Sequence, residues 1–160
     1  MSALSRADHS QSPPRVDIAR QYNAAFDLIE RNLQAGRADK IAFIDDTTSL
    51  TYGELDQRAN RFAHALCQAG VRREERIFLC MLDTVDWPVA FLGAIKAGVI
   101  PIAANTLLKT QDYEFMLSDS RARIAFVSEP LLPAFEGLQE KTATLEELVI
   151  VSPNAMKTRT

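Results

Sequence analysis

The 160-residue sequence has few of the residues that most often carry chemistry: two cysteines, two histidines and six glycines. Cys67 and Cys80 are too far apart for a CxxC pair, and no zinc-binding set is apparent, so no metal ligand is predicted. Both cysteines are expected to be reduced core residues. His64 has no acidic partner three or four residues away, and no base can be paired with a serine. No catalytic residue is therefore predicted.

Clustered glycines are also missing. The six occupy positions 36, 53, 70, 93, 98 and 137. A phosphate-binding loop needs neighbouring glycines whose backbone N–H groups converge on anionic oxygens. The sequence therefore contains no such loop, and Gly70 and Gly98 are expected to end helices instead.

Neither sign of charge dominates the chain. Eighteen basic and 21 acidic residues give a net charge of −3, which argues against a surface for nucleic acid or anionic lipid. The most apolar stretch, residues 85–104, is interrupted by Asp86 and Lys96 and is predicted to be core, not a membrane span. The first 15 residues lack the apolar run of a secretory signal, so a cytoplasmic protein is expected.

Hydrophobic periodicity predicts the order of elements. Residues 17–35 have helical spacing and end at a glycine. Residues 41–44 and 50–52 form a predicted hairpin, and Thr51 and Glu54 have the spacing of a capping box at the start of the next helix. The later elements alternate, with apolar strands at 77–82, 99–103, 124–127 and 148–151 and helices at 86–97 and 110–118. The fold class is therefore α/β, a doubly wound and mainly parallel sheet with flanking helices.

The chain divides into a flexible leader at residues 1–16, an α/β segment at residues 17–151 and a polar tail at residues 152–160. Within the segment, residues 87–95 form a helix with almost no polar face. Such a helix needs cover on every side, so further protein is expected to pack over it. The sheet is likewise expected to end on an open edge at residues 148–151.

Three segments resemble the adenylate-forming superfamily. LTYGELDQRANRFAHALCQAGV, residues 50–71, and LGAIKAGVIPI, residues 92–102, are similar to its first two signatures. REERIFLCMLDTVDWPVAFLGAIKAGVIPIAANTLL, residues 73–108, resembles benzoate-CoA ligases in particular. The resemblance implies the first part of the adenylate-forming fold, within the AMP-binding domain of an aryl-CoA ligase.

In that family a carboxylate and ATP form an acyl-adenylate, and the thiol of CoA then displaces AMP. The complete enzyme uses ATP, Mg²⁺ and CoA on benzoate or a similar aromatic carboxylate. The family's phosphate loop, magnesium ligand, ribose-binding aspartate and late lysine come further along its chain, and none is found here. The fragment alone is therefore expected to be inactive, to need no cofactor, and to bind the remainder of the ligase or itself.

Loops after predicted strands provide the candidate site, because ligands approach open α/β sheets at the carboxyl ends of their strands. Asp83 and Thr84 follow one strand. Asn105, Thr106 and Lys109 follow another, and Lys109 is a candidate for a CoA phosphate. A plain strand-to-helix turn with Thr110 as its N-cap explains the same residues.

Two rival functions remain open at this stage. The chain could be a non-catalytic module that docks onto a separately encoded remainder, and the apolar helix suits that function equally well. It could also be an unrelated stand-alone nucleotide-binding domain, which the absence of a glycine-rich turn disfavours.

Overall fold

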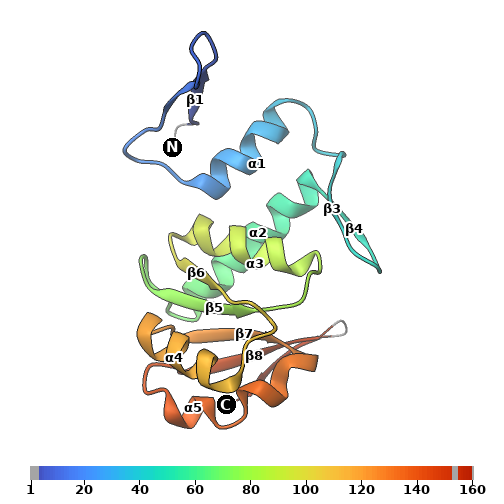
Figure 1. The fold of residues 1–160 in the computed structure, drawn as a ribbon. Helices are drawn as coiled ribbons and strands as arrows, with labels where there is room; N and C mark the ends of the chain where they lie inside the picture. The colour runs from blue at the N-terminus through green and yellow to red at the C-terminus, as the bar shows by residue number, and fades with distance from the viewer. Residues whose placement is uncertain (1–3, 153–154, 160) are drawn as a thin grey trace.

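The computed structural model describes residues 4–152 and the backbone of residues 155–159. Its centre is a five-stranded sheet in the order β6-β5-β7-β8-β9 (Figure 1). The strands are β5 (Arg76–Cys80), β6 (Ile100–Ala103), β7 (Ile124–Ser128), β8 (Glu147–Ser152) and β9 (Ala155–Arg159). The first four run parallel to their neighbours and β9 runs antiparallel to β8, so the predicted mainly parallel sheet is confirmed.

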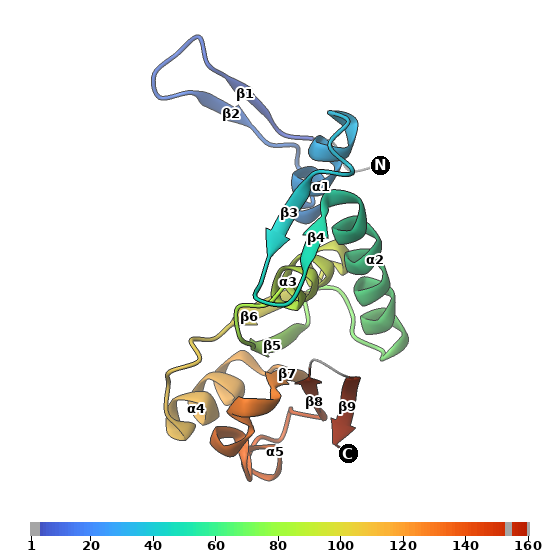
Figure 2. The same cartoon turned by 90° about the vertical axis from the view of Figure 1, so that its right-hand side faces the viewer.

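Helices cover both faces of this sheet (Figure 2). One face carries α2 (Tyr52–Gln68) and α3 (Asp86–Ala97), and the other carries α4 (Thr110–Ser120), η1 (Glu129–Phe135) and α5 (Leu138–Lys141). Side chains of a strand alternate between faces, and β5 shows this directly. Ile77 and Leu79 pack in the core beneath α2 and α3, whereas Phe78 and Cys80 pack in the core beneath α4.

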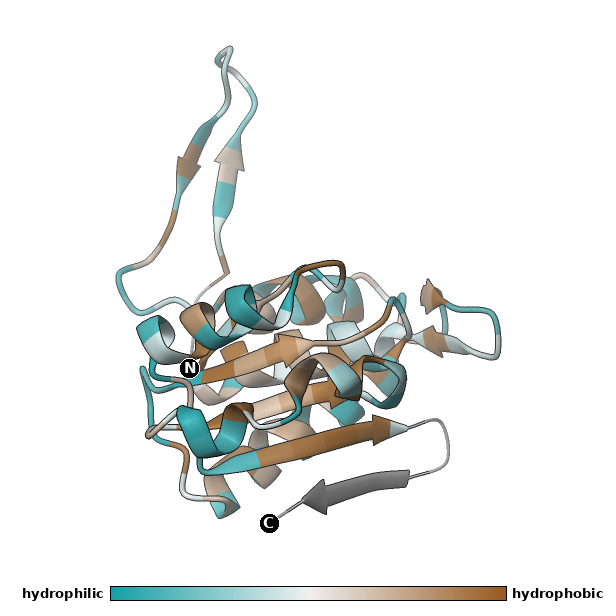
Figure 3. Ribbon diagram, turned by 60° about the horizontal axis from the view of Figure 1, so that its bottom comes forward, coloured by the Kyte–Doolittle hydropathy of each residue, from teal (hydrophilic) through white to brown (hydrophobic). Residues whose placement is uncertain are grey.

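Strands β5, β7 and β8 are apolar along most of their length because both of their faces are largely buried (Figure 3). On one face, α2 and α3 approach closely at Gly93. A Cβ atom at Gly93 would lie 2.9 Å from the carbonyl oxygen of Ala59 and 2.9 Å from a ring carbon of Phe62. Glycine is therefore required where the two helices cross, because a side chain at this position would push α3 away from α2.

Three predicted boundaries or environments are wrong. The first helix, α1 (Ala24–Gln34), begins seven residues later than expected, because the side chain of Asn23 accepts a hydrogen bond from Phe26 N and caps the helix there. Residues 155–159 form β9 within the predicted polar tail, so β8 is not an edge strand. Cys67 is exposed on α2, and only Cys80 is a core residue.

Part of the predicted leader forms a hairpin of β1 (Arg6–Asp8) and β2 (Arg15–Asp17), which projects from the body of the molecule (Figure 2). A second hairpin, β3 (Ile41–Ile44) and β4 (Ser49–Thr51), confirms its prediction and forms a separate two-stranded sheet. It leads into α2 through the predicted capping box, in which Thr51 Oγ1 accepts from Glu54 N and Thr51 N donates to the Glu54 carboxylate.

The helix α3 is covered better than its sequence suggested. Val89, Ala90 and Ala94 are buried, since α1 and α2 both pack against α3. Trp87 and Phe91 are partly buried and stack on each other with ring centroids 4.9 Å apart. The most exposed large apolar side chains near this face lie on β3 and α1 instead.

Candidate functional site

A crevice of about 450 Å³ lies at the carboxyl ends of the parallel strands. Three parts of the chain line it: the β3–β4 turn, the loop between β5 and α3, and the ends of β7 and β8 with the residues that follow β7. Its lining residues are Asp45, Asp46, Thr47, Thr48, Arg58, Leu82, Asp83, Thr84, Val85, Asp86, Ser128, Pro130, Val151 and Ser152. In an open α/β sheet this is the position where ligands bind.

Asp45 joins the turn to the sheet. Its carboxylate accepts hydrogen bonds from Thr47 N and Thr48 N within the turn, both at 2.8 Å, and from Val85 N at 2.9 Å. The bond from Val85 and those within the turn hold the pKa of Asp45 well below its usual range. The sequence contains a signal for the turn, since an aspartate followed by two threonines favours an Asx-turn, but the contact with Val85 is tertiary.

Two further contacts fix the walls of the crevice. Arg58 of α2 forms an ion pair with Asp86 at the start of α3. The hydroxyl of Ser128, which is buried at the end of β7, accepts a hydrogen bond from Leu82 N at 3.0 Å. The loop after β5 is therefore held on one side by β7 and on the other by the β3–β4 turn.

The charge of the crevice does not suit an anionic ligand. Asp45, Asp46 and Asp83 line it in addition to the paired Arg58 and Asp86, so carboxylates outnumber cations. ATP phosphates, CoA phosphates and an aryl carboxylate would all meet repulsion here. The residues of this crevice therefore do not fit the nucleotide of an adenylate-forming reaction, and no step of that reaction is assigned to them.

Among residues 4–152, no group of three or more His, Cys, Asp or Glu side chains is arranged to hold a metal ion. His64 and Cys67 lie one turn apart on α2, and both are exposed, but two side chains are too few for a zinc site. None of the helices that the structure describes is long and apolar enough to cross a membrane.

The structure separates the residues proposed from the sequence. Asp83 and Thr84 line the crevice, whereas Asn105, Thr106 and Lys109 do not. These three lie in the loop between the edge strand β6 and α4. The Asn105 side chain accepts from Leu107 N at 2.9 Å, and the Asn105 carbonyl oxygen accepts from the hydroxyl of Tyr113 at 2.9 Å.

The N-cap position of α4 belongs to Lys109 and not to Thr110, so that prediction is wrong. Lys109 N donates to the carboxylate of Asp112 at 3.0 Å, so this backbone N–H at the start of α4 has an acceptor that is not the Thr110 hydroxyl. The Lys109 side chain is exposed. It stays a proposed CoA contact, on a loop whose described hydrogen bonds are those of an ordinary strand-to-helix connection.

Lys96 lies in the last turn of α3 and has a specific partner there. Its Nζ lies 2.6 Å from Asp56 Oδ1 on α2, and its side chain is largely buried. The ion pair therefore joins α3 to α2, which supports a structural function for this lysine.

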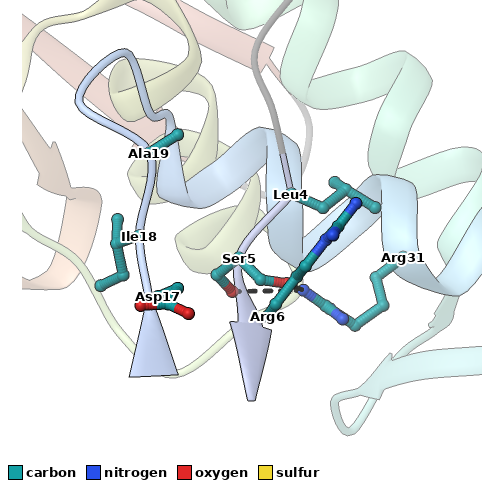
Figure 4. A pocket seen from close by; sticks show the side chains of 7 residues that line it. All are labelled: Leu4, Ser5, Arg6, Asp17, Ile18, Ala19 and Arg31. Atoms are coloured by element: carbon teal, nitrogen blue, oxygen red, sulfur yellow. Dashed lines mark hydrogen bonds between the residues drawn. The ribbon is translucent and has the colours of Figure 1, made fainter. Parts of the chain in front are cut away.

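A second cavity, of about 630 Å³, lies between the β1–β2 hairpin and α1 and is lined by Leu4, Ser5, Arg6, Asp17, Ile18, Ala19 and Arg31 (Figure 4). The hydrogen bond from Arg31 to the Ser5 carbonyl oxygen, 2.8 Å, crosses beside it. Arg31 also pairs with the buried Asp27 at 2.6 Å, and Asp27 accepts further bonds from Ser5 and Tyr22. These polar groups fasten the hairpin to α1, and the cavity is far from the carboxyl ends of the sheet.

Burial raises the pKa of Asp27, but hydrogen bonds from Ser5, Tyr22 and Arg31 outweigh burial and hold the pKa well below its usual range. Asp27 is therefore a charged anchor for the N-terminal segment. Sequence reasoning missed it, because an aspartate in a first helical turn usually serves the helix dipole alone.

The fold, with helices on both faces of a mainly parallel sheet, corresponds to a known family of enzymes. Residues 29–159 match the family described as AMP-binding enzyme, and the chain belongs to that family. Among its relatives, the benzoate–CoA ligase of Thauera aromatica is 54% identical over 151 residues, which are 94% of this chain and 29% of that enzyme. The 4-hydroxybenzoate–CoA/benzoate–CoA ligase of Rhodopseudomonas palustris is 44% identical over 82% of this chain and 24% of that enzyme.

Solved structures agree with this assignment. A benzoate CoA ligase from Burkholderia xenovorans LB400 superimposes with a TM-score of 0.75 and 49% identity, over 84% of this chain and 27% of the other. The anthranilate CoA ligase AuaEII, in complex with anthranoyl-AMP, gives a TM-score of 0.77 and 38% identity, over 81% of this chain and 25% of that enzyme. The chain thus matches the N-terminal portion of these enzymes and spans 24–29% of their length.

Proposed function

We propose that this chain is the N-terminal structural segment of an aryl-CoA ligase that activates benzoate or a similar aromatic carboxylate with ATP and transfers it to CoA. The observation that carries the proposal is the 54% identity to a benzoate–CoA ligase across nearly the whole chain. Identity to relatives named for fatty acids is lower, at 30% for a long-chain-fatty-acid–CoA ligase of Escherichia coli. An aromatic acid is therefore favoured over an aliphatic one.

The segment contributes structure and not chemistry in this proposal. Its crevice is acidic, and its six glycines are separated along the sequence, so the crevice offers no matched site for the phosphates of ATP or CoA. ATP and Mg²⁺ would bind to the parts of a complete ligase that lie beyond the matched residues, and CoA would bind mainly there, with the loop of Asn105, Thr106 and Lys109 as a contact for one of its phosphates. We also propose a cytoplasmic location, which two free cysteines support because disulfides are rare there.

A chimera tests the proposed function. This chain would replace the 151 matched residues of the Thauera aromatica benzoate–CoA ligase. We expect benzoate-dependent pyrophosphate release and benzoyl-CoA formation within tenfold of the parent enzyme, and no activity from the 160-residue chain alone. The matched control is a chimera that carries the corresponding segment of the Escherichia coli long-chain-fatty-acid–CoA ligase, which we expect to be much less active.

A monodisperse and cooperatively folded chimera without activity on benzoate or hydroxybenzoates would overturn the proposal. Activity from the isolated chain would overturn its structural role and revive the stand-alone nucleotide-binding domain.

A further inference from the structure

A cavity of about 590 Å³ lies at the opposite end of the sheet from the acidic crevice. Two of its lining residues fix this position. Arg73 comes shortly before β5 and Gly98 comes shortly before β6, and these strands run parallel, so both residues lie at the amino ends of the strands. The residues that precede α1 form another wall, and the volume is in the range of small-molecule pockets.

The charge of this cavity is positive. Among the described residues, Arg20, Arg73 and Lys96 line it and no carboxylate does. Lys96 is neutralised, because its Nζ lies 2.6 Å from Asp56 Oδ1. Arg20 and Arg73 are exposed, and neither has a salt bridge or a side-chain hydrogen bond within the part of the chain that the structure describes. Two positive charges are therefore available to a ligand.

The end of α3 places Arg73 at the cavity. A Cβ atom at Gly98 would lie 3.1 Å from Cγ of Arg73 and 3.2 Å from its Nε, so the arginine side chain lies directly over this glycine. Glu74 N donates to Gly98 O at 2.8 Å, which ties the segment before β5 to the end of α3. Because the Arg73 side chain is already packed, it loses less conformational entropy when it binds a ligand.

The negative end of the α3 dipole, which would repel an anion, is partly covered. Asn23, another lining residue of the cavity, donates from Nδ2 to the carbonyl oxygen of Ile95 in the last turn at 2.7 Å. The groups that the cavity offers to a ligand are therefore mainly the donors of Arg20 and Arg73.

A phosphate group matches these donors. The planar guanidinium group pairs its N–H groups with two oxygens of a phosphate, and both bonds are assisted by charge. A nucleic-acid backbone is disfavoured, because two available cations on a chain of net charge −3 give it little to bind. The magnesium complex of ATP is also a poor ligand, since Mg²⁺ already occupies phosphate oxygens.

We propose that this cavity binds a phosphate dianion, free or as the phosphomonoester of a small molecule, between Arg20 and Arg73. The inference goes beyond the proposed function, because the cavity lies at the opposite end of the sheet from the crevice. A bound phosphate would link the residues before α1 to the segment before β5 and so stabilise the folded chain.

Arginine-specific labelling tests the site. Phenylglyoxal modifies exposed arginine side chains, and mass spectrometry of peptides measures each arginine separately. The chain is labelled without Mg²⁺ in sodium phosphate, in AMP, or in sodium chloride of equal ionic strength, at about pH 8, where phosphate is a dianion. We expect phosphate to slow the labelling of Arg20 and Arg73 at least threefold relative to chloride, with saturation in the millimolar range. Arg61, an exposed arginine on α2, is the control and should react at the same rate in both salts.

The two phosphate probes distinguish the sources of the ligand. Equal protection by inorganic phosphate and AMP assigns the site to free phosphate, whereas stronger protection by AMP assigns it to a phosphomonoester. Either result supports the phosphate site.

Variants test whether the two arginines form one site. Arg73→Gln is expected to abolish the protection of Arg20, and Arg20→Gln to abolish the protection of Arg73, whereas Arg61→Gln leaves both protected. Circular dichroism establishes that each variant is folded. The same labelling of the chimera, in which all three arginines are present, keeps the test valid when the isolated chain does not fold.

Three outcomes would overturn the phosphate site. Equal protection by chloride would show a general effect of salt. Protection of Arg61 together with Arg20 and Arg73 would show that phosphate acts on the reagent or on the whole surface. Protection of Arg20 that persists in Arg73→Gln would mean an adventitious ion only. Because labelling does not measure ligase activity, each of these results removes this inference and leaves the proposed function standing.

Discussion

The carboxylate of Asp45 accepts a hydrogen bond from the backbone N–H of Val85 at 2.9 Å, across 40 positions of sequence. This contact holds the β3–β4 turn against the start of α3 at the carboxyl end of the sheet. The same carboxylate accepts from Thr47 N and Thr48 N, so one side chain organises both the turn and its attachment.

We expect Asp45→Ala to speed amide hydrogen exchange at Thr47, Thr48 and Val85 by at least tenfold, because all three N–H groups lose their acceptor. The bonds lower the pKa of Asp45 in the folded protein. Their contribution to stability is therefore present above the unfolded-state pKa and is lost as the pH falls through the lower folded value. Asp46→Ala is the control, because no hydrogen bond to its side chain is described. Equal exchange in the two variants would contradict the anchoring role.

The crossing of α2 and α3 gives a prediction about stability. Gly93→Ala is expected to lower the free energy of unfolding by about 1–3 kcal/mol, because the added methyl group overlaps Ala59 O and the ring of Phe62. Gly53→Ala is the matched control. Its nearest contact would be 3.3 Å, so a change of less than about 1 kcal/mol is expected. Chemical denaturation measures both, and a greater loss for Gly53→Ala would show that the crossing tolerates a side chain.

The helices α1 and α3 and the strand β9 show which parts of the fold the sequence predicts and which it does not. The bounds of α3 agree with the prediction for residues 86–97, because Gly98 ends the helix with a φ of 77°, a local signal. The start of α1 was missed because helical spacing extends back to Ile18, whereas the cap at Asn23 decides the boundary. β9 was missed because its pairing with β8 has no apolar pattern of its own.

The candidate site was harder to predict from the sequence than the fold, for a related reason. The loop at Asp83 and Thr84 could be proposed, because the carboxyl ends of parallel strands share one edge of the sheet. The rest of the crevice depends on contacts between distant residues, such as Asp45 with Val85 and Arg58 with Asp86. Such contacts have no periodicity, so no local pattern marks them.

Asp27 gives a prediction about the N-terminal hairpin. Asp27→Asn is expected to lower the free energy of unfolding by about 2 kcal/mol, because hydrogen bonds to a buried carboxylate from Ser5, Tyr22 and Arg31 are weakened. Trypsin is expected to cleave after Arg15 faster in this variant, as the hairpin detaches from α1. Glu30→Gln on the same helix is the control, with a change of less than about 0.5 kcal/mol. Unchanged cleavage at Arg15 would mean that other contacts hold the hairpin.

The acidic crevice predicts the response to nucleotide. Isothermal titration of the chain with ATP and Mg²⁺ is expected to give no saturable heat, because Asp45, Asp46 and Asp83 repel phosphate and no glycine-rich loop is present. The Thauera benzoate–CoA ligase under the same conditions is the positive control. A dissociation constant in the micromolar range for the chain would show that a nucleotide site exists within these residues.

The last prediction concerns the bond that holds the loop after β6. The buried hydroxyl of Tyr113 donates to the Asn105 carbonyl oxygen, and burial, together with the neighbouring Cys80 thiol, raises the pKa of Tyr113 to about 12. At neutral pH, Tyr113→Phe is expected to lower the free energy of unfolding by about 1 kcal/mol. Because the folded pKa is above the ordinary value of about 10, the hydroxyl's contribution is complete below pH 10 and is lost as the pH rises toward 12.

The difference in stability between wild type and Tyr113→Phe should therefore narrow across this range, as followed by urea denaturation at several pH values. Tyr52→Phe is the control, since no hydrogen bond from its hydroxyl is described, and its difference from wild type should stay nearly constant. A gap for Tyr113→Phe that is the same at pH 9 and pH 12 would mean that the neutral hydroxyl does not hold Asn105 in place, and the loop with Asn105, Thr106 and Lys109 would then depend on its own turn.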